Sequence, residues 1–173
     1  TVTVNSGVIC AGQSFTMVGS GANTYTYSSG SAVVTPTASA NYSVTGTSAL
    51  GCVSSNTAIS SVTVNVANVS VVASSSAVCN GQSANLTASG VNTYSWNTGA
   101  TTASISATPS VSTVYSVIGT NTVNGCSNTV TTSISVNANP TVTVNSGVIC
   151  AGQSFTMVPS GANTYTYSNG SAI

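Results

Sequence analysis

The fold of this chain is decided by the stretch Thr1–Val33, TVTVNSGVICAGQSFTMVGSGANTYTYSSGSAV. It returns at Thr141–Ile173 with only three changes among its thirty-three positions, and a diverged copy begins near Ser70. The copies start 69 and 71 residues apart, so the larger repeat is a two-domain unit of 140 residues. Self-similarity at a fixed period indicates a repeat architecture. The sequence therefore predicts a tandem array of domains that stops partway through its third unit.

Each unit has the pattern of short β-strands. Thr1–Asn5 alternates Thr and Val, which is the period-2 signature of a half-buried strand. Tyr25 and Tyr27 are two residues apart and therefore point to the same side of their strand. About seven such strands in roughly 70 residues, separated by turn residues, predict an all-β fold of tandem β-sandwich domains.

The repeats divide the chain into residues 1–68, 69–140 and 141–173, and the last segment is a truncated copy of the first domain. The junctions are short, namely Ala67-Asn68 and Asn137-Ala138-Asn139-Pro140. Neither is a flexible Gly/Ser linker, so we expect successive domains to keep a fixed relation. Because the chain opens and closes inside repeats, we also expect it to be a piece of a longer protein, with its targeting segments elsewhere.

The composition excludes most kinds of chemistry, because the chain contains no Asp, Glu, Lys, Arg or His. A Ser, Thr, Tyr or Cys nucleophile needs a base, a metal or a depressed pKa, and none of the side chains that supply these is present. Calcium sites rely on carboxylates, and nucleic-acid binding relies on cationic side chains. We therefore expect no enzymatic activity, no metal or cofactor and no nucleic-acid partner. No apolar run approaches the roughly 18 residues of a membrane helix.

Two blocks recur in both complete units. They are CAGQSFTMV and ANYSVTGTSALGC in the first, and CNGQSANLT and TVYSVIGTNTVNGC in the second. Their order resembles the immunoglobulin-like repeats of large secreted or surface proteins of gliding Bacteroidota-type bacteria. The resemblance covers the whole chain. It implies immunoglobulin-like domains, an extracellular or cell-surface location, and a role as an adhesin, stalk or spacer.

Cysteines frame each unit: Cys10 and Cys52 in the first, Cys79 and Cys126 in the second. We predict one disulfide per domain, Cys10–Cys52 and Cys79–Cys126, and none between domains. Cys150 copies Cys10 and is left unpaired by truncation. The competing interpretation is a zinc site, but without Cys-x-x-Cys or His its ligands would have to come from separate domains. Disulfides imply an oxidising compartment.

All ten aromatic residues fall on strand positions that recur between units: Phe15, Tyr25, Tyr27, Tyr42, Tyr94, Trp96, Tyr115, Phe155, Tyr165 and Tyr167. Phe15 and Tyr27 of the first unit are replaced in the second unit by Ala84 and Trp96. The loss of side-chain volume at one position is compensated by a gain at the other, which is typical of a packed core. Core packing is therefore favoured over the alternative, a platform of aromatic rings for binding sugars.

The surface residues predict two kinds of partner, namely attached glycans and other copies of the protein. Asn41, Asn68, Asn85 and Asn169 fit the N-glycosylation pattern, although chance matches are expected in so Asn/Ser/Thr-rich a chain. Natural sheets protect their edges with charges, and this chain has none. We therefore expect strands such as Thr1–Asn5 and Ser61–Val66 to accept neighbours, and the protein to associate with itself into a fibre or array.

These features predict a structural extracellular repeat protein that forms a rigid rod, stalk or filament. The alternative is an adhesin repeat that binds glycans or surfaces through its loops. The segment between Gly99 and Pro109 would be the place, since it holds the main length difference between the units.

Overall fold

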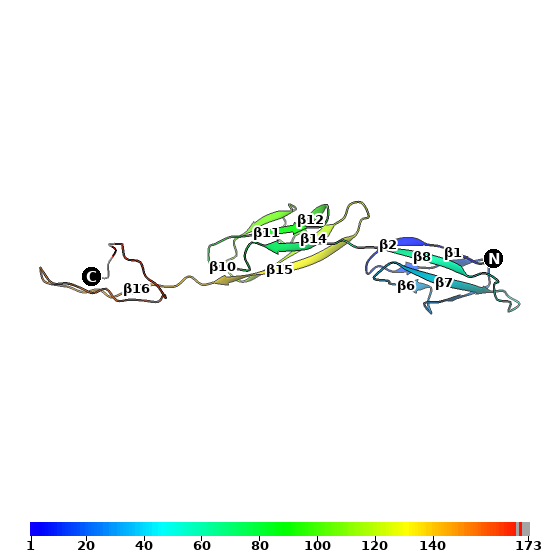
Figure 1. The fold of residues 1–173 in the computed structure, drawn as a ribbon, viewed down its shortest axis with the longest axis horizontal. Helices are drawn as coiled ribbons and strands as arrows, with labels where there is room; N and C mark the ends of the chain where they lie inside the picture. The colour runs from blue at the N-terminus through cyan, green and yellow to red at the C-terminus, as the bar shows by residue number, and fades with distance from the viewer. Residues whose placement is uncertain (169, 171–173) are drawn as a thin grey trace.

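The computed structural model describes residues 1–168 and 170, and it shows two β-sandwiches end to end, followed by a partial third unit (Figure 1). The first sandwich consists of β1 (Thr3–Val4), β2 (Gly7–Cys10), β3 (Phe15–Thr16), β4 (Gly19–Ser20), β5 (Thr24–Tyr27), β6 (Val33–Val34), β7 (Ala40–Thr47) and β8 (Ala58–Asn65). The second consists of β9 (Ser70–Ala73), β10 (Ala77–Cys79), β11 (Ala84–Ser89), β12 (Thr93–Trp96), β13 (Ser104–Ala107), β14 (Thr113–Thr120) and β15 (Ser127–Asn137). The C-terminal segment contributes β16 (Thr143–Val144) and β17 (Pro159–Ser160).

The second sandwich has immunoglobulin-like topology. A four-stranded sheet in the order β10-β15-β14-β12 packs against a three-stranded sheet in the order β13-β11-β9. β10 runs parallel to β15, and the other pairs are antiparallel. Two such sheets of about seven short strands are the immunoglobulin-like arrangement. The predicted all-β, tandem immunoglobulin-like fold class is confirmed, whereas its disulfide arrangement is corrected below.

The first sandwich has the same four-stranded sheet, β2-β8-β7-β5, but its other sheet is divided into the pairs β1-β4 and β3-β6. The division is caused by Asn5. Its Oδ1 accepts a hydrogen bond from the Val18 amide at 2.6 Å, and its Nδ2 donates one to the Thr16 carbonyl at 3.1 Å. In the second domain the corresponding stretch pairs through the main chain, with Val72 opposite Thr87. An amide side chain therefore takes the place of part of a strand ladder.

The seven aromatic side chains of the first two units lie in or against the two cores, as the repeat positions predicted, whereas Phe155, Tyr165 and Tyr167 of the C-terminal segment belong to neither core. Trp96 is 3% exposed beside Ala84, which is 1% exposed, and the indole N–H donates to the Thr102 carbonyl at 2.9 Å. Phe15 and Tyr27 pack against the core of the first domain, around Met17. The small-for-large exchange therefore occurs inside the core, where the larger indole replaces the volume lost from the phenyl ring.

Residues 141–168 show that β2 and β5 depend on their pairing partners. Gly147–Cys150 copies β2 in sequence and Thr164–Tyr167 copies β5, yet neither stretch is a strand. In the first domain β2 pairs with β8 and β5 with β7, and the C-terminal segment contains no counterpart of either partner. An open apolar groove of about 490 Å³ remains, lined in part by Val142, Met157 and Tyr165.

Two expectations about surface segments are wrong. Ser61–Val66 is not a free edge, because β8 lies between β2 and β7 and pairs with both. The segment Gly99–Pro109 is not simply a loop, since it contains β13, which pairs with β11. Within the described residues, no helix is long and apolar enough to span a membrane. The domain boundaries at 68/69 and 140/141 stay a prediction.

Candidate functional site

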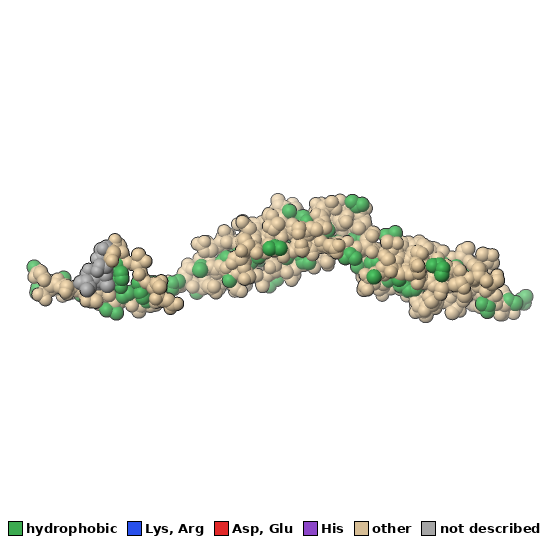
Figure 2. Space-filling model, viewed as in Figure 1, with side chains coloured by type: hydrophobic (Ala, Val, Ile, Leu, Met, Phe, Trp, Pro, Cys, Tyr) green, Lys and Arg blue, Asp and Glu red, His purple; other side chains and the backbone are tan. Residues whose placement is uncertain are grey.

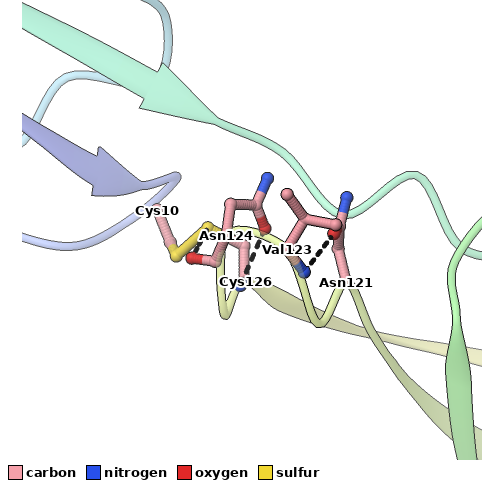
Figure 3. The surroundings of a disulfide bond; sticks show 5 residues. All are labelled: Cys10, Asn121, Val123, Asn124 and Cys126. Carbon is pink, nitrogen blue, oxygen red and sulfur yellow. Dashed lines mark hydrogen bonds between the residues drawn. A yellow bond between two sulfur atoms is a disulfide. The ribbon is translucent and has the colours of Figure 1, made fainter.

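A disulfide bond joins the two sandwiches. It links Cys10, the last residue of β2, to Cys126, which immediately precedes β15 (Figure 3). The two Cα atoms are 5.4 Å apart and the residues are separated by 116 positions in the sequence. This separation lies in the ordinary range for a disulfide. The bond is therefore a covalent connection between domains, in addition to the peptide junction.

The predicted pairs Cys10–Cys52 and Cys79–Cys126 are wrong, as is the expectation of no bond between domains. Among the described residues Cys52, Cys79 and Cys150 are free and exposed. Cys10 lies beside Asn65 at the end of β8, whereas Cys52 precedes the start of that strand. A strand of 8 residues spans about 26 Å, and a disulfide requires Cα atoms within roughly 7 Å. The two cysteines of one domain therefore lie at opposite ends and cannot meet.

The loop before β15 holds Cys126 in place. The Cys126 amide donates to Asn124 Oδ1 at 3.0 Å (Figure 3). The Asn121 amide donates to the Cys126 carbonyl at 2.8 Å. Gly125 has a φ of 71°, which a residue with a side chain rarely adopts, so glycine is needed at this turn. Cys126 is 2% exposed and belongs to the core cluster of the second domain.

The end of β2 holds Cys10 in a similar way. The Gln13 amide donates to the Cys10 carbonyl at 3.0 Å, and the Ala11 amide donates to the Asn65 carbonyl at 3.0 Å. These bonds fix the turn after β2 against the last residue of β8. Cys10 therefore lies at the end of the first domain that faces the junction, and its side chain packs against the core of the second domain.

The peptide junction lies close to the bridge. Ala67 is 3% exposed and is part of the core cluster of the second domain. A small cavity of about 120 Å³ lies between the two connections, and its lining includes Cys10, Val66 and Cys126. With two covalent connections, the domains cannot swing about a single peptide link. In the chain-entropy account, closing a loop of this length removes about 5 kcal/mol of unfolded-state entropy.

Other predicted sites are placed as follows. Asn41, Asn68 and Asn85 are exposed, whereas Asn169 lies outside the described residues. In the part of the chain that the structure describes, no three His, Cys, Asp or Glu residues gather as a metal site would require. The repeat pattern did not predict the inter-domain bridge, although the position of each cysteine relative to the closing strand of its domain points to it. Cys126 directly precedes β15 and Cys52 lies six residues before the start of β8, whereas Cys79 and Cys10 lie next to the other ends of these two strands.

No protein-family model and no curated protein matches this chain. Among solved structures, the fibronectin(III)-like modules of Clostridium thermocellum CbhA are similar, with 13% identity over 80% of this chain and 95% of that one, and a TM-score of 0.33. A Ca²⁺-stabilised adhesin with which an Antarctic bacterium binds ice has 20% identity over 84% of this chain and 51% of that one, with a TM-score of 0.32. The titin domains z1z2, solved in complex with telethonin, have 18% identity over 79% and 94%, with a TM-score of 0.29.

Proposed function

We propose that this chain is a structural segment of an extracellular or cell-surface rod, stalk or filament, in which residues 1–68 and 69–140 are the complete domains. The observation that carries the proposal is the Cys10–Cys126 bond, because it joins successive domains instead of stapling one. A disulfide within one domain would stabilise only the fold of that domain. A bridge between domains fixes their relative orientation, which is a property that a load-bearing rod needs.

The setting and the surface support this role. A structural disulfide persists in oxidising compartments and is rare in the cytosol. The face in Figure 2 shows scattered hydrophobic side chains among polar ones, and the chain has no charged side chain anywhere. Without charges there is no long-range repulsion between copies. Self-association into a fibre or array belongs to the proposal, as does a glycan attached at the exposed Asn41, Asn68 or Asn85.

The role is non-catalytic, and it agrees with the resemblance to immunoglobulin-like repeats of large bacterial surface proteins. The fold does not favour the alternative role as an adhesin, because Ser104–Ala107, within the segment assigned to ligand binding, form β13 in a sheet. Binding of the chain to an array of glycans would favour that alternative.

Small-angle X-ray scattering tests the rod. We expect the oxidised chain to give an extended, narrow distance distribution. The variant Cys126→Ser should give a broader and more variable one, because only the peptide junction remains. Cys52→Ser is the matched control, since it removes an exposed thiol and leaves the bridge intact. Identical scattering from all three proteins would contradict a role of the bridge in rigidity.

A further inference from the structure

Each complete domain has one exposed cysteine, and its position corresponds to that of a bonded cysteine in the other domain. Cys79 in the second domain is the counterpart of Cys10, and Cys52 in the first domain is the counterpart of Cys126. Each domain therefore has one cysteine at each end. At the one junction between complete domains, the two cysteines that face each other are bonded.

Cys79 has the surroundings of Cys10. It ends β10 and lies opposite Asn137 in the parallel pair β10–β15, as Cys10 lies opposite Asn65 in the pair β2–β8. The Gln82 amide donates to its carbonyl at 2.9 Å, and the Asn80 amide donates to the Asn137 carbonyl at 3.0 Å. Both hydrogen bonds have their counterpart at Cys10. The cysteine is thus held at the end of the second domain from which the chain continues.

Cys52 has the surroundings of Cys126. The Ser48 amide donates to the Cys52 carbonyl at 2.9 Å, and the Cys52 amide donates to Ser48 Oγ at 3.1 Å. Gly51, with a φ of 82°, takes the place of Gly125. Both loops therefore close by a hydrogen bond to the cysteine carbonyl, although the loop before Cys126 is one residue longer and binds the cysteine amide through Asn124. No preceding domain covers the loop of Cys52 in this structure. Cys52 is accordingly exposed, whereas Cys126 is buried.

We propose that these cysteines form a relay, in which the Cys10-type cysteine of every domain bonds to the Cys52-type cysteine of the domain that follows it in the same chain. The inference rests on the proposed structural role and names the partner of Cys79: the Cys52-type cysteine of a complete domain that follows Pro140. Two thiols lose two protons and two electrons, and an oxidising disulfide that accepts them becomes two thiols. The sulfur–sulfur bond forms between Cys79 and the incoming cysteine.

The second junction is compatible with this bond. Asn139 Nδ2 donates to the Asn80 carbonyl at 3.1 Å, which holds the junction against the turn next to Cys79. The segment after it pairs Thr143 with Ser160, as Thr3 pairs with Ser20 in the first domain. The segment that begins at Thr141 therefore shares the first strand pair of the first domain. A relay would give every junction two covalent connections, so that a cut in the peptide would not part the rod.

The test is a four-domain chain, made by appending a copy of residues 34–140 to the whole chain. In its first unit Ala138→Lys creates the sole trypsin site, in the exposed second junction. After oxidation and trypsin, we expect the two halves, which are nearly equal in length, to migrate at the mass of the whole chain without reductant and at about half that mass with it. Peptide mapping should join Cys79 to the appended copy of Cys52. Adding Cys79→Ser should separate the halves without reductant, whereas adding Cys52→Ser in the first unit should not.

Several outcomes would overturn the relay: Cys79 recovered as a free thiol, Cys79 bonded to Cys126, or a ladder of disulfide-linked chains, which would mean that the partner belongs to a second copy. If the appended chain does not fold, a tandem of two copies of residues 1–140 tests the same pair within one chain, and a Cys79–Cys126 bond there overturns it. X-ray scattering of the same sample separates the two proposals. A rigid rod with free Cys79 rejects the relay alone, whereas a flexible chain with all the bridges formed rejects the rod.

Discussion

At the scale of single residues, the pairing of the cysteines follows from where each lies along its strand. Cys10 and Cys126 are bonded, and Cys52, Cys79 and Cys150 are exposed thiols among the described residues. We expect native alkylation without reductant to modify three cysteines. The variant Cys126→Ser releases Cys10 and should raise the number to four, whereas Cys52→Ser should lower it to two. Mass spectrometry gives the number of modified cysteines. A single modified cysteine in the unaltered chain would show that the disulfides lie within the domains and would contradict the bridge.

Gly119 is a second residue whose identity the packing requires. A Cβ atom built there would lie 2.5 Å from Val69 Cγ2 and 2.7 Å from Val91 Cγ2. Such overpacking typically costs about 1–3 kcal/mol. We therefore expect Gly119→Ala to lower the free energy of unfolding of the second domain by that amount in urea titrations. Thr131→Ala, at an exposed position on β15, is the control and should change it by less than about 1 kcal/mol.

At the scale of elements, the strands could be predicted from the sequence because the alternation of apolar and polar residues is visible among neighbouring residues. The pairing of strands that are distant in the sequence could not be predicted in this way. The class of fold and the burial of Phe15 and Trp96 follow from repeated patterns. The central place of β8 does not, because its apolar and polar residues alternate as they would in an edge strand. The disulfide required knowledge of which strand ends lie together, and that depends on the parallel pairing of β2 with β8.

The C-terminal segment that begins at Thr141 shows the same dependence. Gly147–Cys150 has the sequence of β2 without its structure, because the partner strand is not there. We expect that appending a copy of residues 34–68 to the C-terminus will convert this stretch and Thr164–Tyr167 into strands. Their amides should then exchange with deuterium more slowly, by at least about tenfold. A scrambled extension of the same composition is the control, and equal exchange in both proteins would contradict the explanation.

At the scale of the whole molecule, the absence of charged side chains predicts a folding stability that does not depend on pH or salt. Folding depends on pH only where the folded and unfolded chains bind different numbers of protons. The chain has no carboxylate, imidazole, amine or guanidinium side chain. The side-chain types whose ordinary pKa values lie near or within the window from about pH 4 to 7, the carboxylic acids and histidine, are absent from this chain. Salt likewise has no side-chain charges to screen.

We therefore expect melting curves of the oxidised chain to superimpose across that pH window, and between low salt and about 0.15 M NaCl. Thr132→Asp, half-buried on β15, is the positive control. Burial raises the pKa of a carboxyl group, so the folded variant would hold its proton more tightly than the unfolded one. Its stability should therefore be greatest at low pH and fall as the pH rises past the folded-state pKa. A shift of more than about 3 °C in the unaltered chain would contradict the prediction and would indicate that ionisable groups outside this sequence, such as an attached glycan or a bound partner, contribute to its folding.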